Sequence, residues 1–283
     1  RAMDTVPELS DEAFGERSPP PVCLEARDIR DGYDVTTPDR VWLSFNWLTH
    51  RRSAGDILGE FKALVSGALK TALEAQDTHA ARYRNRDTGR TEGMVLSYAE
   101  LVERLKARGG SAALARLEAL DRSLAGGTDP LKVSREIVSA AVTEAGIEGP
   151  AVIVGFGSLH YPLVHLERSS AGGDLRGMLQ GVMDAAAMRH GTSIKFKQIF
   201  AGISDMSFFG YRPDAGETGL LAGNTPSAAF TDDAPEGLLS FPTVNIGPWG
   251  RDYHQKWERV HAPYTFEVLP DLVFETALAW LAE

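Results

Sequence analysis

The sequence predicts an α/β protein that combines a partial α+β layer, a helical segment and a mostly parallel sheet flanked by helices. Two strand-like segments, 22–29 and 41–49, precede a helical apolar stripe that begins at Ser53, as in a helix packed on antiparallel strands. After residue 150, apolar strand-like segments alternate with amphipathic helical ones, which is typical of a parallel sheet. The predicted domains are 1–90, 91–149 and 150–283.

The first predicted domain contains two strands and one helix. Segment 22–29 alternates weakly, whereas 41–49 is rich in aromatic and aliphatic residues, and both patterns favour strands. Ser53 can cap a helix, with Asp56 three residues later. The charged, irregular stretch 78–91 is expected to be a surface loop. The apolar stripe of the helix consists of Ile57, Leu58, Phe61, Leu64, Val65, Leu69 and Leu73.

The second predicted domain is helical. Ser97 and Glu100 have the spacing of a capping box for a helix over 97–108. Leucines line one side of the alanine-rich stretch 111–125, which predicts a second helix. An Asp-Pro pair opens a third helix over 129–144, since proline is tolerated in a first turn.

The third predicted domain alternates strands and helices. The continuous apolar run 151–156 suits a strand buried on both faces. An amphipathic helix is expected over 175–188, and strands are expected over 194–199 and 243–246. A closing helix is expected over 270–281.

The composition excludes several classes of protein. The net charge of -10 argues against a nucleic-acid binder, because such a protein needs clustered Lys and Arg. Cys23 is the only cysteine, so an intramolecular disulfide and a cysteine-based zinc motif are both excluded. The sequence contains no 18-residue apolar run and no signal peptide, so we expect a cytoplasmic protein without a membrane partner.

The segment most informative about function is 241–260, Phe-Pro-Thr-Val-Asn-Ile-Gly-Pro-Trp-Gly-Arg-Asp-Tyr-His-Gln-Lys-Trp-Glu-Arg-Val. Its pattern predicts a strand, a Gly-Pro turn and then a helix over 253–260. In that helix His254 and Glu258 would share one face. A histidine so placed can bind a metal, although most such pairs are hydrogen-bonded surface residues, and zinc needs three or four ligands.

A second segment, 202–208, follows a predicted strand and has the sequence Gly-Ile-Ser-Asp-Met-Ser-Phe. It is either an ordinary turn in which Ser204 or Asp205 caps the next element, or a substrate site. In the second case Gly202 permits close approach and Ser204 offers a hydroxyl group.

Residues 245–258 resemble the C-terminal zinc-ligand motif of the aminoacylase, acetylornithine deacetylase and carboxypeptidase G superfamily of dinuclear zinc hydrolases. Their wording, Asn-Ile-Gly-Pro-Trp-Gly-Arg-Asp-Tyr-His, is closest to the arginine-utilisation (RocB-like) branch. The segment 202–205 is similar to the superfamily's Gly-Gly-Thr/Ser-Asp segment and departs from it at Ile203. The resemblance implies His254 as a metal ligand and Glu258 as the group that orients it. It also implies a substrate pocket lined by Gly202, Ser204, Asp205, Asn245 and Gly247.

The resemblance implies a zinc metallopeptidase or amidohydrolase that cleaves peptide or N-acyl amide bonds of amino-acid-like substrates in arginine utilisation. Residues 22–75 would be the later half of a lid domain that forms a homodimer. Residues 93–148 would be a helical elaboration, and 150–283 the C-terminal half of the catalytic domain.

The superfamily's His-x-Asp pair, bridging Asp, Glu-Glu pair, further acidic ligand and lid histidine have no counterpart in the sequence. The chain also begins at Arg1 rather than at methionine. We therefore expect a fragment that lacks the general base. By itself it would bind the two zinc ions poorly or not at all and would not hydrolyse amides. The alternatives are a non-catalytic dimerisation module derived from a metallopeptidase, and a carbohydrate- or nucleotide-binding α/β protein.

Overall fold

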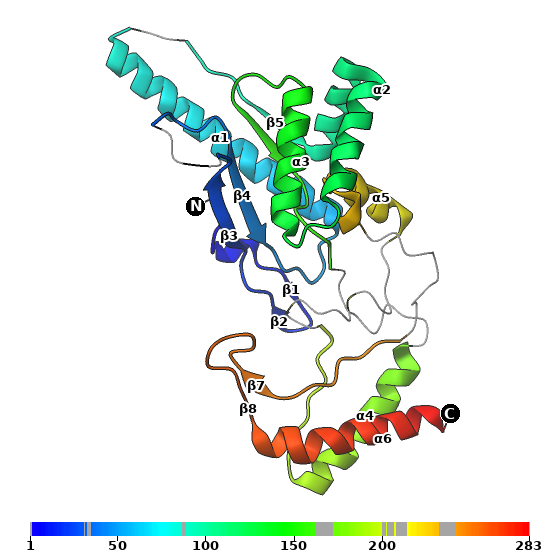
Figure 1. Cartoon of the computed structure of the whole chain (residues 1–283). Helices are drawn as coiled ribbons and strands as arrows, with labels where there is room; N and C mark the ends of the chain where they lie inside the picture. Colours follow the sequence, from blue (N-terminus) through cyan, green and yellow to red (C-terminus); the bar gives the residue numbers. More distant parts are fainter. Residues whose placement is uncertain are drawn as a thin grey trace. The chain divides into compact units, whose positions relative to one another are not determined.

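The chain forms two units in the computed structural model shown in Figure 1. One unit consists of Arg1–His160 and Pro213–Ala234, and the other of Tyr161–Arg212 and Pro235–Glu283. The three domains expected from the sequence stay predictions. The structure describes residues 2–30, 32, 35–86, 89–161, 172–199, 202, 207, 214–231 and 242–282.

Antiparallel hairpins open the first unit. A short 3₁₀ turn, η1 (Pro7–Leu9), precedes the two-residue strands β1 (Glu12–Ala13) and β2 (Glu16–Arg17), which pair with each other. The longer strands β3 (Val22–Asp28) and β4 (Val41–Asn46) also pair antiparallel. Both longer strands were predicted from the sequence, and the pair confirms them.

Helix α1 (Ala54–Arg84) follows β4 and begins where the sequence predicts. The side chain of Ser53 accepts a hydrogen bond from the Asp56 amide, and the Asp56 carboxylate accepts one from the Ser53 amide. The prediction of a surface loop over 78–91 is wrong for its first half, because the helix continues to Arg84. Alanine and long charged side chains favour helix there, and the helix ends only where Asn85 adopts a left-handed conformation with φ 50°.

A parallel strand pair lies at the centre of the first unit. Strand β5 (Met94–Ser97) pairs along its length with β6 (Ala151–Val154), and the connection between them contains two helices. These helices are α2 (Tyr98–Leu124) and α3 (Pro130–Glu144). Their starts confirm the predicted capping box of Ser97 with Glu100 and the predicted Asp-Pro start, since the Asp129 side chain accepts from the Lys132 amide.

The two helices expected over 97–108 and 111–125 are both present within α2, on either side of a kink at Gly110. Gly110 interrupts α2 with φ 62° and ψ -159°, a backbone conformation that belongs to glycine. The core of the first unit lies between α2 and α3. It consists of Tyr98, Leu101, Leu105, Ala113, Leu117, Val133, Ile137, Ala141 and Ala145.

A later segment of the chain returns to the first unit as helix α5 (Ala215–Asn224) and the short 3₁₀ turn η4 (Ala228–Phe230). The Glu217 carboxylate accepts a 2.7 Å hydrogen bond from the amide of Ala54, the first residue of α1. This hydrogen bond therefore links the first turn of α5 to the first residue of α1.

The described elements of the second unit are two helices, a π-helical turn and a small hairpin. Helices α4 (Gly172–His190) and α6 (Leu269–Leu281) pack on each other and confirm the helices expected over 175–188 and 270–281. The π-helical turn η5 (Tyr264–Val268) leads directly into α6. The buried residues of this packing are Met183, Ala186 and Leu272, whereas Leu175 and Leu179 of α4 form a separate buried cluster.

The strands expected over 194–199 and 243–246 are wrong, since the described residues of both segments have no regular secondary structure. The apolar side chains of the two segments pack against the core residues of α4 instead. The packed side chains are those of Ile194, Phe196, Val244 and Ile246. In the described residues, β5 and β6 are the one parallel pair, and the other sheets are two-stranded and antiparallel. The α/β class is therefore confirmed, whereas the expected mostly parallel sheet is not found in the described residues.

None of the helices in the described part of the chain combines the length and the apolar character that crossing a bilayer requires. The cytoplasmic location expected from the sequence stays a prediction.

Candidate functional site

The candidate metal ligand His254 lies in a hairpin of the second unit, which we call the histidine hairpin and define as residues 249–261. Its strands are β7 (Gly250–Arg251) and β8 (Arg259–Val260), which pair antiparallel. A Cβ atom at Gly250 would come within 2.4 Å of the Arg259 carbonyl oxygen, so the close pairing of the strands requires glycine at this position.

The helix expected over 253–260 is wrong. Asp252 and His254 adopt left-handed conformations with φ 57° and 60°, which no α-helix of L-residues accommodates. The chain turns through residues 252–257 and then enters β8. His254 therefore lies within the turn and Glu258 directly after it, and the two do not share one face of a helix.

Glu258 nevertheless contacts His254. Its Oε2 atom accepts a 3.1 Å hydrogen bond from the backbone amide of His254, and both residues are exposed. The resemblance implies that Glu258 orients His254, and the contact in the structure is with the His254 main chain.

Sequence reasoning missed the other contacts that define the histidine hairpin. Arg259 forms an ion pair with Asp252, and the Tyr253 hydroxyl donates a 2.9 Å hydrogen bond to the Pro248 carbonyl. The Trp249 and His261 rings lie 4.6 Å apart at 40°, and the His261 amide donates to the Trp249 carbonyl at 2.7 Å. The sequence signals only the turn, and not these contacts. Asp and His follow a glycine turn, and both residue types are enriched in the left-handed region of φ and ψ.

The other predicted site residues are not brought together with His254 by the described structure. Asn245 and Gly247 are exposed in the irregular segment before β7, and a Cβ atom at Gly247 would meet no atom within 4 Å. Gly202 lies in a bend. Ser204 and Asp205 lie outside the described residues. The substrate pocket stays a prediction.

The predicted ligand His254 would offer a zinc ion one nitrogen, and the histidine hairpin also contains His261, whose Nδ1 accepts a hydrogen bond from the Tyr264 amide at 3.3 Å. Zinc in proteins takes three or four ligands, and the neutral imidazole is a common one. Within the described residues no three His, Cys, Asp or Glu side chains gather as a metal-binding group. The donor set described here therefore fits a zinc ion only in part.

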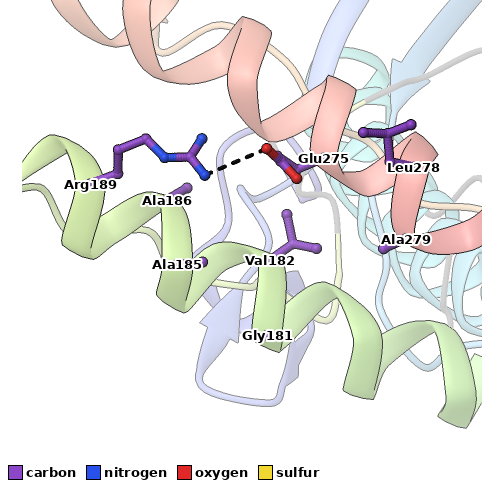
Figure 2. A pocket seen from close by; sticks show the side chains of 8 residues that line it. All are labelled: Gly181, Val182, Ala185, Ala186, Arg189, Glu275, Leu278 and Ala279. Carbon is purple, nitrogen blue, oxygen red and sulfur yellow. Dashed lines mark hydrogen bonds and ion pairs between the residues drawn. The ribbon is translucent and has the colours of Figure 1, made fainter.

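A separate cavity of about 380 Å³ lies between α4 and α6, and Figure 2 shows its lining. At one side Arg189 pairs with Glu275 at 3.5 Å. Arg189 also pairs with Asp271 at 3.2 Å, and His190 Nε2 lies 2.8 Å from the same carboxylate. The hydrogen bonds from His190 and Arg189 lower the pKa of Asp271. The remaining lining residues are Gly181, Val182, Ala185, Ala186, Leu278 and Ala279, and none of the predicted site residues is among them.

A second histidine, His160, ends the segment that follows β6 in the first unit. Burial lowers the pKa of its imidazole, and the charge of Glu217 partly opposes that effect. The ring lies 6.2 Å from that of Phe156 in an edge-to-face arrangement. His160 is therefore a packed histidine whose burial disfavours the charged form and so lowers its pKa.

The fold and the histidine hairpin together define an α/β protein in which the predicted ligand His254 is exposed. The chain is similar over its whole length to the uncharacterized protein YqjN of Bacillus subtilis (strain 168), at 29 % identity over 298 residues. It is also similar, over 95 % of its length, to Protein RocB of the same organism, at 24 % identity over 282 residues. The chain covers 52 % of YqjN and 49 % of RocB, and so spans about half the length of these relatives.

No family model matches the chain, and no solved structure matches it. The similarity to RocB agrees with the predicted likeness to the RocB-like branch. Membership of the dinuclear zinc superfamily stays a prediction.

Proposed function

We propose that the protein is a metal-dependent hydrolase of peptide or N-acyl amide bonds of amino-acid-like substrates, and that it acts in arginine utilisation. The observation that carries the proposal is the similarity to RocB, which extends over 95 % of the chain rather than over one motif. The exposed imidazole of His254, held on a glycine-dependent hairpin, supports it with a side chain suited to zinc.

In this proposal His254 supplies one ligand to a site for two zinc ions. Bound zinc acidifies a water molecule and polarises the scissile carbonyl. The pocket residues would be Gly202, Ser204, Asp205, Asn245 and Gly247. The general base and the other ligands would come from an N-terminal segment that the chain lacks and that its longer relatives have room for, so we expect the chain alone to bind zinc poorly and to leave amides intact.

The test compares His254→Ala with His79→Ala in the protein as its gene encodes it. His79 is an exposed histidine on α1 and serves as a matched control. Bound zinc is measured by elemental analysis, and hydrolysis is measured on a panel of N-acetyl amino acids. We expect His254→Ala to lose zinc and activity, and His79→Ala to keep both. Equal zinc content in the two variants would remove His254 from the ligand set.

The same measurement on the 283-residue chain tests the proposed shortage of ligands. We expect little bound zinc after dialysis. A tight zinc site with one ion per chain would contradict that part of the proposal.

A second candidate function is a non-catalytic module that forms a homodimer, and the β3–β4 pair favours it. A two-stranded sheet is marginally stable by itself, and this one exposes aliphatic side chains. Such a surface, with free strand edges in the described residues, favours association with a second copy. The exposed fractions are 43 % for Val22, 60 % for Leu24, 67 % for Val41 and 58 % for Leu43.

Light scattering combined with gel filtration tests the dimer. We expect a dimer for the native chain and a monomer for Leu24→Lys with Leu43→Lys, since buried ammonium groups are unfavourable. A native chain that is monomeric at high micromolar concentration would exclude this candidate.

A further inference from the structure

The cavity between α4 and α6 has two kinds of wall, which Figure 2 shows. One wall is the ion pair between Arg189 of α4 and Glu275 of α6. The volume of about 380 Å³ lies near the lower end of the range for ligand pockets, roughly 300 to 1,000 Å³, and so suits a small molecule. The other wall is apolar, and its residues are Gly181, Val182, Ala185, Ala186, Leu278 and Ala279.

The apolar wall is open to solvent beside a part of the unit that is closely packed. Met183 and Leu272 are buried where the two helices pack on each other. Ala185 and Leu278 of the wall are exposed instead, because the short side chains around them leave space that the helices themselves do not fill. An aliphatic group that entered this space would bury apolar surface of its own and of the wall, and this favours binding.

The ion pair at the cavity is weak. Nη2 of Arg189 lies 3.5 Å from Oε1 of Glu275, and the two side chains are 49 % and 41 % exposed. An ion pair this exposed contributes little to stability, so a ligand can replace it without a large loss. Nη1 of the same guanidinium lies 3.2 Å from Oδ2 of Asp271, a contact that keeps Arg189 beside α6 when Glu275 is released.

Opening the pair leaves a cation and an anion next to an apolar wall. A free α-amino acid carries the complementary set of groups. Its carboxylate fits the planar guanidinium of Arg189, which donates paired hydrogen bonds to carboxylates, and its ammonium group fits the carboxylate of Glu275. An aliphatic side chain fits the wall. A fatty acid lacks the ammonium group and an alkylamine lacks the carboxylate, so neither satisfies both charges.

We infer that the cavity between α4 and α6 binds a free amino acid with an aliphatic side chain, with Arg189 holding its carboxylate and Glu275 its ammonium group. None of the residues predicted for the hydrolase lines this cavity. The inference therefore does not rest on the proposed function, and its test requires no metal.

The first experiment is an NMR titration of the 283-residue chain with L-leucine, followed at the amides of Val182 and Ala279. We expect saturable shifts with a dissociation constant on the order of 1 mM, an affinity within reach of a ligand this small. N-acetyl-L-leucine and L-leucinamide each lack one charge and should bind at least roughly tenfold more weakly. Affinity should rise from alanine through valine to leucine, by up to about fourfold for each added CH₂ group. Equal binding of leucine and its two derivatives would overturn the inference.

The second experiment repeats the leucine titration with variants of the ion pair. Arg189→Met keeps the aliphatic stem and removes the charge, and Glu275→Gln keeps the shape of the side chain. Each should weaken leucine binding at least roughly tenfold. Arg116→Met is a matched control, because Arg116 of α2 also forms an exposed ion pair with a second helix, through Glu144 of α3. It should bind leucine as the native chain does.

The third experiment blocks the cavity without changing a charge. Ala185 is exposed on α4, and leucine is a good helix former, so Ala185→Leu should leave the circular dichroism spectrum and the midpoint of thermal denaturation nearly unchanged. The larger side chain fills part of the cavity and should abolish leucine binding. Undiminished binding in a folded Ala185→Leu, or an equal loss in Arg189→Met and Arg116→Met, would overturn the inference. If Ala185→Leu does not fold, the ion-pair variants decide alone.

Discussion

The guanidinium of Arg135 in α3 donates a 2.8 Å hydrogen bond to the carboxylate of Glu25 in β3, and this joins segments 110 residues apart. The Arg135 side chain is 9 % exposed and that of Glu25 is 25 % exposed. Arg40, just before β4, donates 2.8 Å hydrogen bonds to the carbonyl and hydroxyl oxygens of Ser139 in α3. The β3–β4 hairpin is therefore held to α3 by polar contacts.

The first prediction concerns this ion pair. Glu25→Ala leaves the buried guanidinium without its partner and should lower the free energy of unfolding by about 3 kcal/mol, as for broken buried pairs. The double variant Glu25→Leu with Arg135→Met should lose less, because no charge remains buried. Urea denaturation measures both. A double variant that is less stable than Glu25→Ala would contradict this account of the pair.

The second prediction contrasts two glycines. Gly110→Ala should destabilise the protein by about 2 kcal/mol, because φ 62° with ψ -159° is accessible essentially to glycine alone. Gly67→Ala should stabilise it by about 1 kcal/mol, because this residue is exposed inside α1 and its added Cβ meets no atom within 4 Å. Thermal denaturation followed by circular dichroism gives both changes. Equal effects of the same sign would refute the conformational argument.

Local signals in the sequence predicted the starts of the helices well. A capping box depends on residues three positions apart, so Ser53 with Asp56 and Ser97 with Glu100 are visible without tertiary information. The Arg135–Glu25 contact depends on how distant segments meet, and no pattern in one sequence shows it.

Apolar alternation misled the prediction of strands in the second unit. The segments 194–199 and 243–246 do bury apolar side chains, but against α4 rather than within a sheet. Alternation reports which side chains are buried, and it does not report which partner the backbone amides find.

The candidate site itself stays a prediction. The resemblance selected His254 and Glu258, and the structure shows a contact between them. The four-residue spacing suggested a helix, whereas left-handed conformations at Asp252 and His254 make a turn. Spacing fixes relative position only when φ and ψ are already known, so the role of the His254 amide could not be predicted.

The third prediction concerns acid stability and Asp11. Oδ2 of this carboxylate accepts hydrogen bonds from three consecutive backbone amides, those of His50 at 2.8 Å, Arg51 at 2.7 Å and Arg52 at 3.2 Å. Burial by itself raises the pKa of Asp11, but the amide hydrogen bonds outweigh it and hold the pKa below its ordinary value.

A carboxylate whose pKa is lower in the folded state stabilises that state at pH values above the ordinary Asp pKa of about 3.9. This contribution to the free energy of unfolding is lost as the pH falls through the folded-state pKa. Asp11→Ala should therefore lower the free energy of unfolding by about 2 kcal/mol at pH 7, since it leaves amide donors without an acceptor. It should also flatten the pH dependence below about pH 4. Urea titrations from pH 2 to pH 7 measure both effects. Parallel pH profiles for the native and variant chains would exclude Asp11 as a source of acid sensitivity.

The fourth prediction separates stability from metal binding at residue 254. Glycine adopts φ 60° without the steric cost that other residues incur, so His254→Gly should raise the free energy of unfolding by up to about 1 kcal/mol. His254→Ala keeps that cost and should leave stability unchanged or slightly lower, because histidine tolerates the left-handed region better than alanine. Both variants lose the imidazole and should lose zinc equally. Urea denaturation gives the order of stability, and a glycine variant less stable than the alanine variant would show that residue 254 is not strained. The expected opposite changes in stability and metal binding would mean that the histidine is kept at this position for its ligand nitrogen, at a cost to the stability of the hairpin.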